Sequence, residues 1–172
     1  MKLFVISAHK LRLSKRTKTR NMKKLFIVFL FLATTTAFSQ DTVWLTHFDE
    51  AAKLSQKTKK PILANFTGSD WCGWCKILKR EVFDTAEFKK WAKKNVVLLE
   101  LDFPRRTKIS PKLKKQNTAL QRAFRVRGYP TVWLFKVGEG DDPKKDLQPL
   151  GKTGYRKGGP KVWIKSIDQY LP

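Results

Sequence analysis

The amino-acid sequence predicts an α/β domain in which a mixed sheet of four to five strands is sandwiched by helices on both faces. The first observation is a set of short apolar runs of strand length, at residues 62–66, 96–101 and 131–137. The second is the helical spacing of apolar residues between the first two runs, because a strand, a crossover helix and a strand make a parallel pair. The third is the short turn-rich connection at 138–143, which predicts an antiparallel hairpin.

The first expected elements are a helix over 46–58 and a buried strand over 62–66. Thr46 is the expected N-cap of the helix, with Asp49 at its third position. Pro61 introduces the apolar run of the strand. The helix side chains expected to face inward are Phe48, Ala51, Ala52 and either Leu54 or Ser55.

A second helix is expected to open at Cys72 and Cys75, after a break in the chain at 68–70. A short third helix is expected over 86–94, and it leads into the strand 96–101. The second helix is expected to be amphipathic, with a buried face made of Ile77, Leu78, Val82 and Phe83.

The remaining elements follow a basic loop at 103–108. The pair Ser110 and Pro111 predicts a helix start, since proline is tolerated at the first helical position, and this helix is expected to reach about residue 124. A weaker strand is expected over 147–153. The final helix is expected to start at 158–160, with an apolar face made of Val162, Trp163, Ile167, Tyr170 and Leu171.

Residues 1–39 are expected to be an N-terminal extension and signal peptide, and residues 40–172 the folded domain. From residue 22 onward the chain has two lysines, an apolar run at 25–32, and small residues at Ala37 and Ser39. These are the three parts of a secretory signal, here 22–39, with expected cleavage after Ser39. An uncleaved anchor is the alternative, although the run is short for a membrane span. We therefore expect a periplasmic or secreted protein.

Residues 1–21 precede a segment that is a complete signal by itself. They are best explained by a start codon assigned too far upstream.

The chain without residues 1–39 is strongly basic. It has 28 Lys and Arg against 14 Asp and Glu, a net charge of +14. Such a charge can favour nucleic acid. The lysines are scattered along expected helix faces and no nucleic-acid motif accompanies them, so we expect no binding of nucleic acid. We also expect a monomer.

Cys72 and Cys75 are the only cysteines of the chain, so within it each can form a disulfide only with the other. A bond across so short a loop restrains little unfolded-chain entropy and is a weak structural staple. The pair therefore favours redox exchange. Unpaired N–H groups at a helix start stabilise a thiolate, which predicts attack by Cys72 and resolution by Cys75. Asp70 should oppose the thiolate and Lys76 should favour it, and the sequence alone does not decide between them.

The Cys72 and Cys75 pair has two rival interpretations, a metal site and a non-catalytic module. A metal site needs three or four ligands, and the two cysteines with His47, the one histidine beyond residue 39, supply few. We therefore expect no metal and no other cofactor. The second rival is a non-catalytic binding or chaperone module, against which the intact cysteine pair argues.

The run Asn65 to Cys75 and the later Gly128-Tyr129-Pro130-Thr131 resemble the thioredoxin superfamily. The run is similar to exported bacterial thioredoxin-like proteins related to the C-terminal domain of the membrane thiol:disulfide interchange protein. The resemblance covers about residues 45–170. It implies a thioredoxin-like fold, a protein-disulfide oxidoreductase, and a cis Tyr129–Pro130 bond in a loop that packs against the cysteines.

The resemblance also implies partners and a substrate face. The partners are proteins with disulfides or thiols, and a membrane electron-donor protein, with reductase or isomerase chemistry favoured. The residues expected to face substrate are Trp71, Gly73, Trp74, Tyr129 and Pro130. The other tryptophans beyond residue 39, Trp44, Trp91, Trp133 and Trp163, are expected to pack in the core.

Two departures from the family pattern leave the redox direction open. The family carries a buried aspartate before the motif, and here that position is Asn65, which cannot accept a proton. Proton handling must then fall to water or to another group. Between the cysteines stand Gly73 and the bulky, uncharged Trp74, which leaves the redox potential undetermined.

Overall fold

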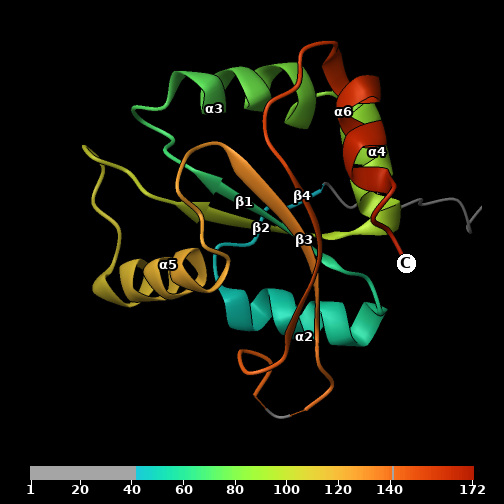
Figure 1. Cartoon of the computed structure of the whole chain (residues 1–172). Coiled ribbons are helices and arrows are strands. Elements are labelled where there is room, and N and C mark those ends of the chain that lie inside the picture. The colour runs from blue at the N-terminus through green and yellow to red at the C-terminus, as the bar shows by residue number, and fades with distance from the viewer. Residues whose placement is uncertain (1–41, 141) are drawn as a thin grey trace, which may run out of the picture. The chain divides into compact units, whose positions relative to one another are not determined.

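The computed structural model describes residues 42–140 and 142–172, so the predicted signal peptide and extension lie outside the described part (Figure 1). The elements follow the predicted order, and they are α2 (Phe48–Thr58), β1 (Ile62–Thr67), α3 (Gly73–Leu78), the π-helical turn η1 (Lys79–Phe83), α4 (Ala86–Asn95), β2 (Val97–Asp102), α5 (Pro111–Ala123), β3 (Thr131–Val137), β4 (Leu147–Thr153) and α6 (Gly159–Asp168). No helix of the described part is both long and apolar enough to cross a membrane.

The sheet has four strands in the order β2-β1-β3-β4. β1 pairs with β2 in parallel, and with β3 in the antiparallel sense. β4 returns antiparallel to β3, with an irregularity in register between Leu134 and Phe135. A single bridge between Leu45 and Leu99 extends the pairing beyond β2 without forming a fifth strand. The mixed sheet and its hairpin are therefore confirmed.

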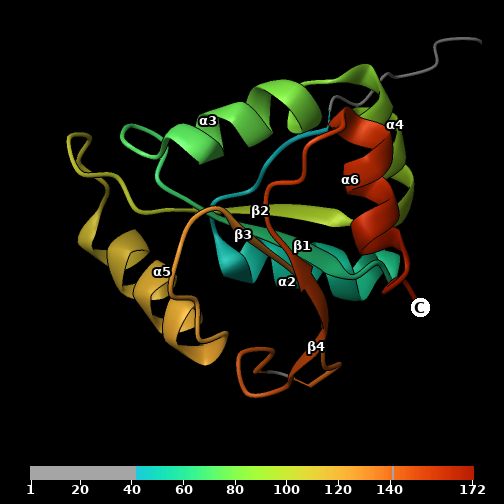
Figure 2. The ribbon, with the colours of Figure 1, turned by 45° about the horizontal axis from the view of Figure 1, so that its top comes forward.

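Helices cover both faces of the sheet, as predicted (Figure 2). All six residues of the central strand β1 are buried, and successive side chains enter opposite cores. Ala64 and Phe66 face the core beneath α2 and α5. Leu63 faces the core beneath α3, η1, α4 and α6. The apolar run at 62–66 therefore reflects burial on two sides rather than one.

The predicted N-cap at Thr46 is wrong. Helix α2 begins at Phe48, and its N-cap residue His47 makes no side-chain cap hydrogen bond. The Phe48 N–H donates instead to Oε1 of Gln116 on α5 at 2.9 Å, and Nε2 of Gln116 donates to the Thr46 carbonyl at 3.0 Å. The first N–H of the helix thus has its acceptor on a side chain 68 residues away, so this N–H requires no local capping residue.

The inward faces of the helices are largely as predicted. Ser55 is the buried alternative in α2, where its hydroxyl donates to the Lys60 carbonyl, while Leu54 is 41% exposed. In the second helix Leu78, Val82 and Phe83 are buried and Ile77 is half-buried. The chain there widens into η1, with Asp84 N–H donating to the Lys79 carbonyl at 2.9 Å.

The last helix buries a narrower face than predicted. Trp163 and Ile167 are fully buried, whereas Val162 is 48% exposed. Helix α6 ends at Asp168, so Tyr170 lies beyond it, with its ring against Gly151 of β4. Of the other expected core tryptophans, Trp44, Trp91 and Trp133 pack half-buried against the two cores.

Candidate active site

The two cysteines lie where the chain passes from β1 into α3. Cys72 is the N-cap residue of α3 and is joined to Cys75 by a disulfide, with 5.3 Å between their Cα atoms. The Cys75 N–H donates to Sγ of Cys72 at 3.2 Å. Cys72 and Cys75 are 6% and 5% exposed as whole residues, so burial in this oxidised state does not distinguish them. The two cysteines differ in their positions at the helix start, because Cys72 is the cap residue before α3 and Cys75 lies within its first turn.

Trp74 is the most exposed aromatic side chain next to the disulfide, at 59%. Its ring centroid lies 5.2 Å from that of Tyr155, which follows β4. The Tyr155 hydroxyl donates to Oε2 of Glu81 at 2.7 Å, and this hydrogen bond raises the pKa of the phenol. Sequence reasoning missed Tyr155, because it lies 74 residues from Glu81 and no local pattern links the two.

Trp71 belongs to the turn between β1 and α3, residues 68–72, here called the cysteine turn. Its Nε1 donates to the Phe103 carbonyl at 2.8 Å, and its ring meets the ring of Tyr129 edge to face at 5.7 Å between centroids. A Cβ on Gly68 would lie 2.5 Å from the Trp71 ring, so only glycine fits the approach of this turn. The structure thus brings together Trp71 and Tyr129, two of the predicted substrate-facing residues.

Pro130 directly precedes β3, and Gly73 is the first residue of α3. The Tyr129–Pro130 bond is cis, as the resemblance implied. Thr131, the next residue, pairs in register with Phe66 at the end of β1, from which the cysteine turn departs. Gly73 is exposed, and a Cβ built there meets nothing within 4 Å. The surface beside the disulfide is therefore open at Gly73.

The Asp70 carboxylate lies at the surface and binds the backbone of the loop 103–108. Its two oxygens accept N–H groups of Arg105, Arg106 and Thr107 at 2.7–3.0 Å. These backbone donors, that of Arg105 first, lower the pKa of the carboxyl to about 2. Nζ of Lys76 donates to the Asp70 carbonyl at 3.2 Å. The aspartate expected to oppose the Cys72 thiolate is thus committed to a neighbouring loop.

Asn65 is buried on β1, on the face that looks toward α3. Its Oδ1 has no hydrogen-bond partner among the described residues. Its register partner on β2 is Glu100, and burial raises the pKa of that carboxyl. The side chain in place of the family aspartate is therefore neutral, and an ionisable carboxyl stands beside it on the next strand.

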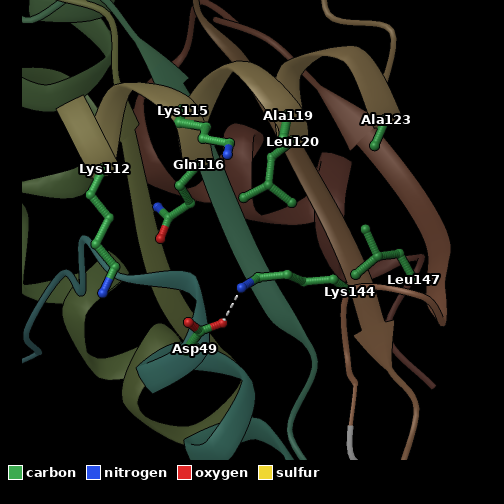
Figure 3. Close-up of a pocket in the computed structure, with 9 residues that line it drawn as sticks. All are labelled: Asp49, Lys112, Lys115, Gln116, Ala119, Leu120, Ala123, Lys144 and Leu147. Carbon is green, nitrogen blue, oxygen red and sulfur yellow. Dashed lines mark ion pairs between the residues drawn. The ribbon is translucent and has the colours of Figure 1, made fainter.

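A separate pocket of about 340 Å³ lies between α5, α2 and the β3–β4 connection (Figure 3). Nζ of Lys144 and Oδ1 of Asp49 form an ion pair across it at 2.7 Å. None of the predicted site residues lines this pocket. Within the described ranges there is also no group of three or more side chains suited to hold a metal ion.

Comparison with known proteins places this geometry in context. Residues 48–146 match the family model of the thioredoxin-like domain. The disulfide bond reductase DsbH of Chlamydia pneumoniae is 29% identical over 124 residues, which are 72% of this chain and 70% of that protein. The thioredoxin of Rickettsia felis is 32% identical over 88 residues, 51% of this chain and 70% of that protein.

A second relative in Chlamydia pneumoniae, the thioredoxin-related protein DsbJ, is 27% identical over 84% of this chain but only 42% of its own length. The chain therefore spans less than half of that relative. Among solved structures, a DsbH oxidoreductase superposes with a TM-score of 0.67 at 27% identity, covering 76% of this chain and 85% of that one. A thioredoxin of Thermus thermophilus shares the fold, with a TM-score of 0.54 at 16% identity over 74% of this chain and 86% of its own.

Proposed function

The chain belongs to the thioredoxin-like domain family, and from that premise we propose that it is an exported thiol–disulfide oxidoreductase whose redox pair is Cys72 and Cys75. The observation that carries the proposal is the disulfide between these residues at the start of α3, next to Trp71, whose ring contacts Tyr129 of the cis-proline loop. A general thiol–disulfide role agrees with its relatives, which include a disulfide bond reductase.

The proposed reaction divides between the two cysteines by position. In the reduced protein the Cys72 thiolate attacks one sulfur of a substrate disulfide, forms a mixed disulfide, and expels the other substrate sulfur as a thiolate. Cys75 then loses its proton and attacks Sγ of Cys72, which releases the second substrate thiol. The Cys75 N–H, 3.2 Å from Sγ of Cys72, stabilises negative charge on the attacking sulfur.

The proposed docking surface consists of the residues that surround the disulfide. Trp74 offers an exposed apolar ring on one side, and Trp71 with Tyr129 forms the other side. Gly73 leaves the approach to the sulfur atoms open. Backbone of the Tyr129–Pro130 loop is proposed to pair with an extended substrate peptide in the manner of an added strand.

We further propose that residues 22–39 direct export and that residues 40–172 form the mature domain. The support is the order of basic, apolar and small residues before Gln40. Export puts the cysteine pair in an oxidising compartment, where reduction of substrates needs electrons from a membrane donor protein. Intact-mass measurement of the protein recovered from the periplasm checks this, because cleavage after Ser39 leaves Gln40 as the first residue.

The proposed direction is reduction or isomerisation of substrate disulfides. Equilibration with glutathione measures the potential, and a value near that of thioredoxin, about −270 mV, supports a reductase. A value near that of protein disulfide isomerase, about −180 mV, supports isomerisation. A value near −120 mV, that of a strong oxidant, would contradict both.

Insulin reduction by dithiothreitol tests the oxidoreductase itself. The wild-type protein should accelerate it, and Cys72→Ser should abolish the acceleration. In a separate reaction without dithiothreitol, pre-reduced Cys75→Ser should accumulate a mixed disulfide with insulin, because the resolving thiol is absent; later addition of dithiothreitol should remove this mass adduct. A folded wild-type protein that binds insulin without accelerating its reduction would identify a non-catalytic binding module.

A further inference from the structure

The loop 103–108, here called the basic loop, connects β2 to the start of α5 on the side of the disulfide that carries Trp71. It contains three cations, Arg105, Arg106 and Lys108, and no acidic residue. All three are exposed. The basic loop is therefore a concentrated positive charge against residues 69–71, directly before Cys72, unlike the lysines spread along the helices.

Hydrogen bonds join the basic loop to residues 69–71 at its beginning and in its middle. At its beginning, the Phe103 carbonyl accepts Nε1 of Trp71, and the preceding Asp102 accepts both the N–H and the hydroxyl of Ser69. In its middle, three successive N–H groups donate to Asp70. The loop backbone is thus held before any substrate arrives, so little ordering is needed on binding.

The cations of the basic loop are available to a ligand. The guanidinium of Arg105 lies over the Trp71 ring, with Cζ 3.9 Å from the ring centroid. The nearby carboxylates of Asp70 and Asp102 accept N–H and hydroxyl donors, and the charge of Asp70 also attracts Arg106 without a direct ion pair. In the described part of the chain, no ion pair joins Arg105, Arg106 or Lys108 to a carboxylate.

We propose that the basic loop makes this protein select disulfides whose cysteines are flanked by acidic side chains, in a partner peptide that docks across Trp71. The inference rests on the proposed thiol–disulfide exchange and names the substrate class of the same site. Pre-positioned positive charge accelerates encounter with a negative partner, and it fixes the orientation of that partner through charge complementarity. Arg105, stacked on the Trp71 ring, lies closest to the substrate backbone in this arrangement.

The exchange itself balances without another reactant. The reduced protein donates two electrons and two protons to the peptide disulfide, which becomes two peptide thiols. The protein returns to the Cys72–Cys75 disulfide seen in the structure. The basic loop takes no part in bond making, and it acts on the encounter and on the orientation of the peptide.

Peptide disulfides of one length and differing charge test the proposal. The peptides carry a central cysteine flanked by Glu, Gln or Lys, have blocked ends, and are oxidised to symmetrical dimers. The reduced full-length protein is mixed with each peptide, quenched with an alkylating agent, and read by mass spectrometry. Each rate constant is divided by that of dithiothreitol with the same peptide, which removes the intrinsic reactivity of the disulfide.

The wild-type protein should prefer the Glu peptide over the Gln peptide on the order of tenfold at low ionic strength, and the preference should fall in 0.5 M NaCl. The triple variant Arg105→Gln, Arg106→Gln, Lys108→Gln should lose the preference. Arg105→Lys should keep most of it, since it keeps the charge. A matched control removes three exposed cations of α4, on the far side of the molecule in Figures 1 and 2, by Lys89→Gln, Lys90→Gln and Lys94→Gln.

The outcomes separate this inference from the proposed function. Exchange with no peptide at all would overturn the proposed function. Exchange with equal rates for the Glu, Gln and Lys peptides would leave the function standing and overturn the substrate class. An equal loss of preference in the α4 control would show that net charge, and not the basic loop, attracts the peptide. A loop-dependent rate with oxidised glutathione but not with the peptides would replace the peptide by a small anionic disulfide.

Discussion

Glu100 is an ionisable side chain held mostly out of water on β2, beside Asn65. Burial raises the pKa of its carboxyl above the ordinary 4.5, the charge of Asp102 raises it further, and Lys79 acts in the opposite direction. In the unfolded chain the carboxyl ionises at its ordinary pKa, while the folded state keeps its proton to higher pH. The contribution of protonated Glu100 to the free energy of unfolding is therefore present below pH 4.5 and is lost as the pH rises through its folded pKa.

Glu100→Gln should increase the free energy of unfolding at pH 7.5 relative to the wild type, because the amide avoids a buried charge. The gain should vanish at pH 3.5, where the wild-type carboxyl is protonated in both states. Urea unfolding at the two pH values measures it. Glu87→Gln, an exposed position on α4, should give no gain at either pH. A wild type more stable than Glu100→Gln at pH 7.5 would show that the charge is well satisfied.

At the level of elements, the helix starts use different devices. In α5 the Ser110 hydroxyl accepts the Leu113 N–H at 3.2 Å, and in α4 the Thr85 hydroxyl accepts the Phe88 N–H at 3.3 Å. Helix α2 has His47 at the equivalent position with no such bond, and Gln116 of α5 supplies the acceptor. Two helices are thus capped locally, and the third depends on the packing of another helix.

This difference predicts unequal effects of the same substitution at two helix starts. Ser110→Ala should lower the free energy of unfolding by about 1 kcal/mol, because one N–H of α5 loses its acceptor. His47→Ala should change it by less than about 0.5 kcal/mol, since no cap bond is lost. Chemical denaturation of both variants measures the values. Equal losses would mean that the Ser110 hydrogen bond contributes nothing specific.

At the level of the whole molecule, Trp163 joins the sheet to the layer of helices that carries the cysteines. It is fully buried, and its ring centroid lies 5.3 Å from that of Phe83 and 5.7 Å from that of Phe88. Its Nε1 donates to the Gly154 carbonyl at 2.9 Å, just before Tyr155. One side chain near the C-terminus therefore supports the turn η1, helix α4 and the loop behind Trp74.

Trp163→Ala should destabilise the protein by about 3–5 kcal/mol, because it removes a buried aromatic group and leaves a cavity. Val162→Ala, the adjacent and half-exposed residue, should change stability by no more than about 0.5 kcal/mol. Thermal and urea unfolding of the pair provide the comparison. A loss for Trp163→Ala close to that for Val162→Ala would mean that the core refills around the missing ring.

The order of the elements and the position of the redox pair could be predicted from the sequence, because both depend on local patterns. The strands over residues 131–137 and 147–153 have the predicted ends, since turn residues bound each run. Cys72 stands at the predicted helix start, after a strand and a break in the apolar run. Hydrophobic period, capping residues and turn chemistry act over a few residues, and they are visible in the chain alone.

The tertiary structure decided what depends on residues far apart in the chain. Gln116 replaces the predicted cap at Thr46, Tyr155 packs against Trp74, and Asp70 accepts backbone N–H groups of the basic loop. Glu100 reaches the side of Asn65 only through the register of two strands. Each of these contacts joins segments more than 30 residues apart, and only the packing of the sheet and its two helical layers brings the partners within hydrogen-bonding or van der Waals distance.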